Sequence, residues 1–267
     1  MTRTALPLVL LLALAPLGAC QQQDVTSRGA LLDRMLERYD AARGGVGGFV
    51  VTGGGGEATH GALPDSTADL APPAIVPVGD APPDPEVLSL LAQQVPNVRL
   101  LAQALRAATL DGPRDLRGRR VYILTAEPGA PGAPTLHVVV DAETFDVREI
   151  EQAVTADTLD RPVLSRLLYD DFRTVDGLTV PFRVRQIREG MDQFIPMQER
   201  MVRGGQLAVA KGQIDLLPPG SERERRRAQI DRDLRLYTDG VQETELRVDR
   251  VRVLPRPPAG GALPRPE

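Results

Sequence analysis

The spacing of apolar residues changes from a helical period to a period of two near Thr109, and this change sets the fold class. Before this point, apolar residues recur three and four positions apart. After it they alternate with polar residues, most regularly over residues 178–185, where Leu, Val, Phe and Val alternate with Thr, Pro, Arg and Arg. Such alternation is typical of an antiparallel strand with one buried face. The sequence therefore predicts an α+β protein.

Helices are predicted over residues 28–43 and 84–109. The first carries its apolar stripe at Leu31, Leu32, Met35, Leu36 and Tyr39 and ends before two glycines. The second begins at Asp84-Pro85, an N-cap followed by a proline at the first helical position, and is broken at Val95-Pro96. A short strand is expected over residues 48–52, and the Gly/Pro-rich stretch 53–83 has room for one or two weak edge strands, such as 74–78.

Strands are predicted over residues 121–126, 136–140, 145–147, 167–174, 178–185 and 243–253. Two hairpin signals join them: Asp141-Ala142-Glu143, and Asp176-Gly177. In the final strand the apolar residues change parity, because Leu246 and Val248 are followed by Val251 and Val253. This indicates a bulge, or a strand that crosses between two environments.

Residues 191–240 return to a helical period and predict a helical hairpin inserted between two strands. Ser221 with Glu224 has the spacing of a capping box at the start of the second helix. That helix is rich in arginine, which favours either a solvated face balanced by nearby carboxylates or a surface for anionic headgroups. The arginines are Arg223, Arg225, Arg226, Arg227, Arg232 and Arg235.

Residues 1–19 have the pattern of a secretory signal peptide: a basic start at Arg3, an apolar run over residues 6–14, and small residues before a cut site. The run is too short to span a bilayer. Leu17-Gly18-Ala19-Cys20 resembles a lipobox, which implies lipid on Cys20, the only cysteine, and a tether over residues 20–27. Gln21 favours the outer membrane over the inner. The alternative is an ordinary secretory signal ending in a chance cysteine.

The residue types exclude several chemistries. A net charge of −4 argues against nucleic-acid binding. The two histidines, His60 in a Gly-rich loop and His137 on the polar side of a strand, have no metal-spaced partners, so no metal or cofactor is expected. Neither a Gly-x-Ser-x-Gly elbow nor a phosphate loop is present. Asp170-Asp171 is interpreted as a solvated pair, so no enzymatic activity is expected.

Two segments resemble the LolA/LolB-like outer-membrane lipoprotein-sorting superfamily. They are YDDFRTVDGLTVPFR over residues 169–183 and VVVDAET over residues 138–144. The resemblance implies a domain over residues 28–254, built as a curved antiparallel sheet (an incomplete β-barrel) whose concave face is covered by helices. Residues 191–240 are an insertion relative to that pattern, and residues 255–267 a disordered tail.

The resemblance also implies a function: a non-enzymatic, lipid-anchored protein on the periplasmic face of the outer membrane that binds acyl chains of lipids or lipoproteins and takes part in lipoprotein sorting. The expected cavity lining is Phe49, Val51, Leu136, Val138, Val140, Phe145, Val147 and Phe182. The alternative is a sensor or scaffold of the same fold that binds a protein partner through residues 191–240.

Overall fold

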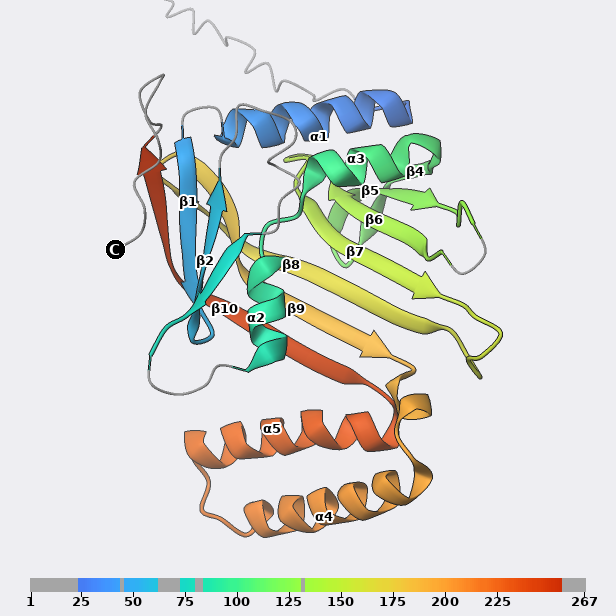
Figure 1. Cartoon of the computed structure of the whole chain (residues 1–267), viewed down its shortest axis with the longest axis vertical. Coiled ribbons are helices and arrows are strands. Elements are labelled where there is room, and N and C mark those ends of the chain that lie inside the picture. The colour runs from blue at the N-terminus through green and yellow to red at the C-terminus, as the bar shows by residue number, and fades with distance from the viewer. Residues whose placement is uncertain (1–23, 44–45, 62–72, 80–83, 131–132, 256–267) are drawn as a thin grey trace, which may run out of the picture.

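The predicted α+β class is confirmed by the computed structural model, which describes residues 24–43, 46–61, 73–79, 84–130 and 133–255 (Figure 1). Within these residues ten strands form one antiparallel sheet, in the order β3-β2-β1-β10-β9-β8-β7-β6-β5-β4, and there are five α-helices. The sheet is not closed into a barrel, since no pairing joins its described edge strands β3 and β4. The predicted signal peptide, Cys20 and residues 256–267 lie outside the described part of the chain.

The elements follow one another in this order. The first half contains α1 (Arg28–Arg43), β1 (Val46–Gly53), β2 (Gly56–Gly61), β3 (Ala74–Pro77), α2 (Pro85–Ala92), α3 (Val98–Ala104), a 3₁₀ turn η2 (Leu105–Ala107), β4 (Thr109–Leu116) and β5 (Arg119–Ala126). The second half contains β6 (Thr135–Asp141), β7 (Val147–Val154), β8 (Val163–Val175), β9 (Leu178–Glu189), a 3₁₀ turn η3 (Met191–Phe194), α4 (Met197–Asp215), α5 (Ser221–Thr238) and β10 (Gln242–Pro255).

Strand β10 joins the two halves of the sheet. Its first part, up to Arg247, pairs with β9, and the part from Val248 onward pairs with β1. The register shifts there, because Gly53 opposes Val248 while Thr52 opposes Arg250, so Asp249 is the extra residue of a bulge. The bulge, one of the two alternatives indicated by the change of parity, is therefore confirmed, and the strand changes its pairing partner from β9 to β1 at the same place. Gly53 is required at this crossing, because a Cβ would lie 2.6 Å from the Arg247 carbonyl oxygen.

The β8–β9 hairpin follows from a two-residue turn. Asp176 and Gly177 have φ angles of 48° and 84°, as expected for the turn predicted from these residues. Val175 then pairs with Leu178, and the alternation carries one apolar face into the core. The residues of that face are all buried: Leu178, Val180, Phe182 and Val184.

Helices α1, α2 and α3 share a single apolar core with the sheet. Helix α1 contributes Leu31, Leu32, Met35 and Tyr39, as its predicted stripe implies. The predicted cap of α2 is confirmed, since the Asp84 carboxylate accepts the backbone N–H of Glu86 at 2.8 Å. The segment expected as a tether contacts the domain from Asp24 onward: Asp24 pairs with Arg120 at 2.8 Å, and the backbone N–H of the buried Val25 donates to the Tyr122 hydroxyl at 2.7 Å.

Three local predictions are corrected. Phe145 lies in the turn before β7 rather than in a strand, with φ at 58°. Ser221 is the first residue of α5, whose N-cap is Gly220 without a side-chain cap bond, so the capping box does not form. His60 is not in a loop: it lies in β2, is 9% exposed, and stacks on Phe49 with ring centroids 4.6 Å apart. Edge strand β4 was not predicted, because it lacks apolar alternation.

Helices α4 and α5 pack side by side at the end of the molecule opposite α1 (Figure 1). Neither helix has a buried residue. Asp192 secures their base, since it pairs with Arg161 and with Arg200 at 3.0 Å. No helix in the described ranges is both long and apolar enough to cross a membrane.

Candidate functional site

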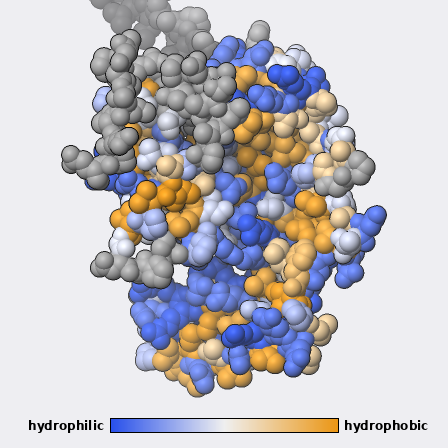
Figure 2. Space-filling model, viewed as in Figure 1, coloured by the Kyte–Doolittle hydropathy of each residue, from blue (hydrophilic) through white to orange (hydrophobic). Residues whose placement is uncertain are grey.

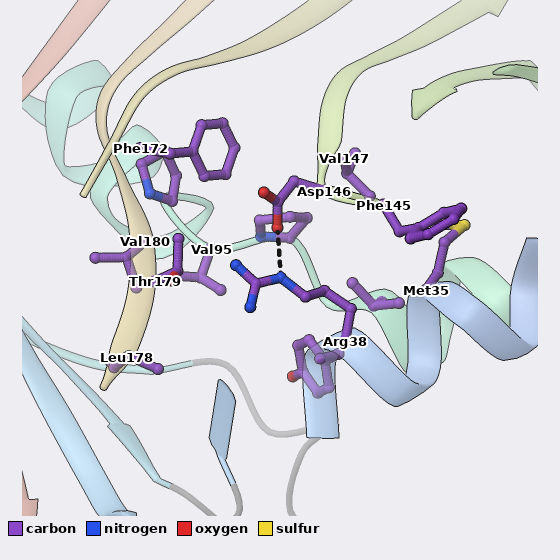
Figure 3. A pocket seen from close by; sticks show the side chains of 14 residues that line it. Met35, Arg38, Val95, Phe145, Asp146, Val147, Phe172, Leu178, Thr179 and Val180 are labelled. Carbon is purple, nitrogen blue, oxygen red and sulfur yellow. Dashed lines mark hydrogen bonds and ion pairs between the residues drawn. The ribbon is translucent and has the colours of Figure 1, made fainter. Parts of the chain in front are cut away.

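A small cavity lies beneath α1, where that helix meets the α2–α3 linker, the β6–β7 turn and the β8–β9 hairpin (Figure 3). Its volume is about 50 Å³. Most of the lining side chains are apolar. They are Met35 and Tyr39 from α1, Val95, Pro96 and Val98 from the linker and the start of α3, Phe145 and Val147 beside the turn, and Phe172, Leu178, Val180 and Pro181 from the hairpin.

The charged side chains in the lining of this cavity form one ion pair. Arg38 Nε of α1 lies 3.4 Å from Asp146 Oδ1 of the β6–β7 turn (Figure 3). The two side chains are 36% and 15% exposed, so the pair sits at the margin between core and solvent. Such a pair contributes about 0.2–1 kcal/mol. It connects helix and turn without fixing them rigidly.

The turn that carries Asp146 is organised by the buried Asp141. One Asp141 carboxylate oxygen accepts the backbone N–H groups of Glu143 and Thr144, both at 3.0 Å, and the other accepts two bonds from Arg148. Burial alone raises the pKa of Asp141, but the backbone donors Thr144 and Glu143 and then the Arg148 guanidinium outweigh it and hold that pKa below its usual value. Asp141 is therefore ionised at neutral pH.

The eight residues predicted to line a ligand cavity all belong to the core or pack against it. Only Phe145 and Val147 line the cavity itself. Phe49, Val51, Val138, Val140 and Phe182 are buried in close contact with other core residues, and Leu136 packs on that core. Alternation identified the correct face of the sheet, but it carries no information about where packing leaves a void. Met35 and Tyr39 were in the predicted stripe of α1, whereas nothing in the sequence signalled the Arg38–Asp146 pair.

The size of the cavity limits what it holds in this conformation. Ligand pockets usually have volumes of about 300–1,000 Å³, and one water occupies about 30 Å³ of liquid. The cavity beneath α1 is several-fold smaller than such a pocket and accommodates at most a few water molecules or the methyl end of a chain. A longer apolar ligand requires α1 to move away from the sheet.

A second, larger cleft of about 590 Å³ separates α5 from α2 and β10. Its lining is polar, with six carboxylates against two arginines. The carboxylate of Glu86 accepts bonds from Gln242 and from the Thr244 hydroxyl, the latter at 2.7 Å, and so ties α2 to β10. This cleft is an open, polar junction between the sheet and the hairpin.

The acidic pair and the second histidine occupy ordinary structural positions. Asp171 pairs with Arg173, whose hydrogen bonds lower the Asp171 pKa, and Asp170 lies 3.6 Å from Arg185. His137 Nδ1 is 2.9 Å from the Thr125 hydroxyl across the β5–β6 ladder. Within the described ranges no three His, Cys, Asp or Glu side chains are grouped to hold a metal ion.

Most of the α5 arginines pair with carboxylates, which supports the interpretation of a solvated, balanced face. The pairs are Arg223 and Arg227 with Asp215, Arg225 and Arg226 with Glu222, and Arg235 with Glu243. Arg232 donates to Gln229.

Fold and cavity together define the class: an α+β protein with an open ten-stranded antiparallel sheet and a small apolar cavity under its first helix. Comparison of the chain with family models, with curated proteins and with solved structures finds no match.

Proposed function

We propose that the protein binds an acyl chain of a lipid or lipoprotein between the sheet and helices α1–α3, as a member of the LolA/LolB-like class. In this proposal the open sheet is an incomplete barrel whose concave face the three helices cover, and α4–α5 is an inserted hairpin. The observation that carries the proposal is the apolar cavity under α1, with the Arg38–Asp146 pair at its margin.

The energetics of such binding are favourable once α1 swings outward. Each methylene taken out of water contributes about 0.8 kcal/mol, so about ten buried carbons supply several kcal/mol. At the rim this motion breaks a partly exposed ion pair of about 0.2–1 kcal/mol. It also takes the buried side chains of Leu31, Met35 and Tyr39 out of the core, a loss that the acyl chain offsets by covering the apolar surface they leave. Helix α1 and the linker then act as the lid, and the apolar faces of β6, β7 and β9 as the floor.

Anchoring by lipid on Cys20 brings this lid close to the membrane. Four residues separate Cys20 from Val25, whose backbone N–H is bonded to Tyr122. The five steps from Cys20 to Val25 span at most about 18 Å when fully extended. A protein held this way on the periplasmic face of the outer membrane presents α1 rather than α4 to the bilayer (Figure 1).

Native mass spectrometry of the full chain with Cys20→Ala, purified from cells, tests the proposal. The Cys20 substitution removes the anchoring lipid, so that any bound lipid is cargo. We expect a co-purifying acyl species that is lost in Val95→Trp, because an indole at this partly buried linker position fills the cavity. Gln213→Trp, on the exposed side of α4, is the matched control. A clean apo mass for the parent protein contradicts the proposal.

A second candidate function is a scaffold that binds a protein partner through α4 and α5. It is favoured by the large apolar side chains that α4 leaves exposed, among them Met201 at 71% and Val209 at 64%. A protein partner recovered with the parent chain but lost when residues 191–240 are removed, together with a clean apo mass, supports this candidate.

A further inference from the structure

Helix α4 has a second apolar face, which points away from α5 and from the sheet. Large side chains on it are 52–71% exposed: Met201, Val202 and Val209. Leu216, directly after the helix, is 85% exposed. The outward face of a helix on a soluble protein is normally charged. Figure 2 shows the resulting apolar surface at the α4 end of the molecule.

The apolar face follows a seven-residue repeat. Val202, Val209 and Leu216 are spaced by seven, and Gly205 and Gly212 are also spaced by seven, three positions after Val202 and Val209. This is the a and d spacing of a helix that pairs with another helix. The exposed charged residues of α4, Glu199 and Arg203, fall outside the stripe at about 100° per residue.

The two glycines of the stripe have no role within one copy of the chain. A Cβ added to Gly205 or to Gly212 would meet nothing within 4 Å. Each glycine in a helix interior costs about 1 kcal/mol relative to alanine. Glycine on a helix face is used where another backbone approaches closely. The seven-residue repeat and the open space beside both glycines both indicate that another helix packs on this face.

We propose that a second copy of this chain docks on the face, with its α4 antiparallel to the first. In that register Val209 lies against Gly205 of the partner subunit, and Val202 lies against Gly212 of the partner subunit, so each large side chain meets a space. Parallel pairing would instead oppose valine to valine and glycine to glycine. A two-fold interface opposes a face to itself, which requires the face to be free of like charge. The stripe meets that requirement.

The interface is small, and the dimer is accordingly weak. Helix α4 has 19 residues and is about 28 Å long. One helix pair of this length buries less than the standard of about 800 Å² per partner, which places it among transient contacts. The face lies at the end of the molecule opposite α1, so it stays accessible whether or not the cavity under α1 binds a ligand (Figure 1).

Disulfide cross-linking tests both the partner and its direction. In the full chain with Cys20→Ser, single cysteines are introduced by Ala208→Cys near the centre of the stripe and by Gln198→Cys or Leu216→Cys at its ends. Antiparallel pairing predicts that Ala208→Cys forms a covalent dimer by itself. The two end variants, about 27 Å apart along the helix, form one only when mixed with each other. Self-linking of either end variant alone overturns the antiparallel register.

Sedimentation equilibrium at rising concentration tests the face without new thiols. We expect a reversible dimer in the Cys20→Ser chain and at least tenfold weaker association in Val209→Glu, with Arg226→Glu on α5 as the unaffected control. Gly205→Ala should weaken the dimer while raising the unfolding temperature of the monomer, a pair of opposite changes that misfolding does not produce. A protein that stays monomeric at 200 µM overturns the proposal. Binding of the chain to phosphatidylcholine vesicles that depends on Val209 overturns it as well.

Discussion

The sheet with α1–α3 and the α4–α5 pair are stabilised in different ways. Helix α2 has only eight residues, yet it buries Leu90 and Leu91 completely. Helices α4 and α5 have 19 and 18 residues and bury no side chain. Their mutual contacts include ion pairs such as Lys211–Asp231, at 2.6 Å between side chains that are 33% and 42% exposed.

This difference indicates where stability and interaction are concentrated. Burial of aliphatic side chains is the main favourable contribution to folding, whereas exposed ion pairs contribute little. The sheet with α1–α3 is therefore expected to set the free energy of global unfolding, and the α4–α5 pair is expected to open locally at a lower free energy. A helix pair that keeps apolar surface exposed gains the missing burial when another chain covers it.

The largest expected effect on stability is from a charge placed in the core between the sheet and α1–α3. Val180→Asp puts a carboxylate at a position with 0% exposure and should cost several kcal/mol in the free energy of unfolding. Thr179→Asp, on the opposite face of β9 and partly exposed, should cost about 1 kcal/mol or less. Urea unfolding of both variants measures the difference, and equal costs would contradict the buried face assigned to β9.

A matched pair of truncations compares the two regions directly. Leu90→Ala in α2 should cost about 2–5 kcal/mol, because the site is fully enclosed. Leu207→Ala in α4 removes the same atoms from a partly exposed position and should cost no more than about 1 kcal/mol. Denaturant midpoints at constant m value give both numbers. A loss in Leu207→Ala as large as in Leu90→Ala would show that α4 and α5 belong to the same cooperative unit as the sheet.

Ion pairs should follow the same division. Asp141→Asn removes a buried carboxylate with four bonds and should cost about 1–3 kcal/mol at pH 7, whereas Asp231→Asn in α5 should cost less than about 0.5 kcal/mol. The folded pKa of Asp141 is lowered, so its contribution is complete above about pH 4 and is lost as pH falls through that pKa. The loss of stability at acid pH should therefore be smaller in Asp141→Asn than in the parent chain. An unchanged loss would mean that other carboxylates cause it.

A small change in stability is also expected at the rim of the cavity. Arg38→Ala breaks the pair with Asp146 and should lower the free energy of unfolding by less than about 1 kcal/mol. If α1 is a lid, the same variant should take up a fluorescent fatty acid faster than the parent chain. Arg34→Ala, one turn earlier on the exposed side of α1, should leave the uptake rate unchanged. Equal rates in all three proteins would argue against a lid.

Local signals in the sequence were sufficient for much of the fold. Asp84 before Pro85 predicted the start of α2, and Asp176-Gly177 predicted the β8–β9 turn, because each depends on atoms within a few residues. The change of parity near Asp249 predicted the bulge for the same reason. Strand β4 was missed, since an edge strand with few neighbours needs no alternating apolar face.

The candidate site was much less accessible from the sequence. Arg38 and Asp146 are 108 positions apart, and their pairing depends on how α1 lies on the sheet. Alternation predicted that Val138 and Val140 point inward, but whether they line a void depends on every side chain opposite them. The apolar stripe on α4 is visible in the sequence as a repeat, yet only the structure shows that α5 covers the other side of the helix.

The position of β10 has a consequence for the order in which the molecule assembles. Strands β1–β3, near the start of the described chain, reach the rest of the described sheet only through β10, which is synthesised after the other nine described strands. The ladder between β1 and β10 closes a loop of almost 200 residues, from Val51 to Val251. Such distant pairings form slowly, because the chain entropy is lost before the contacts form. Strands β1–β3 therefore cannot join the rest of the sheet until β10 has been synthesised. Until then, a ribosome-bound or truncated chain exposes the unpaired edge of β1.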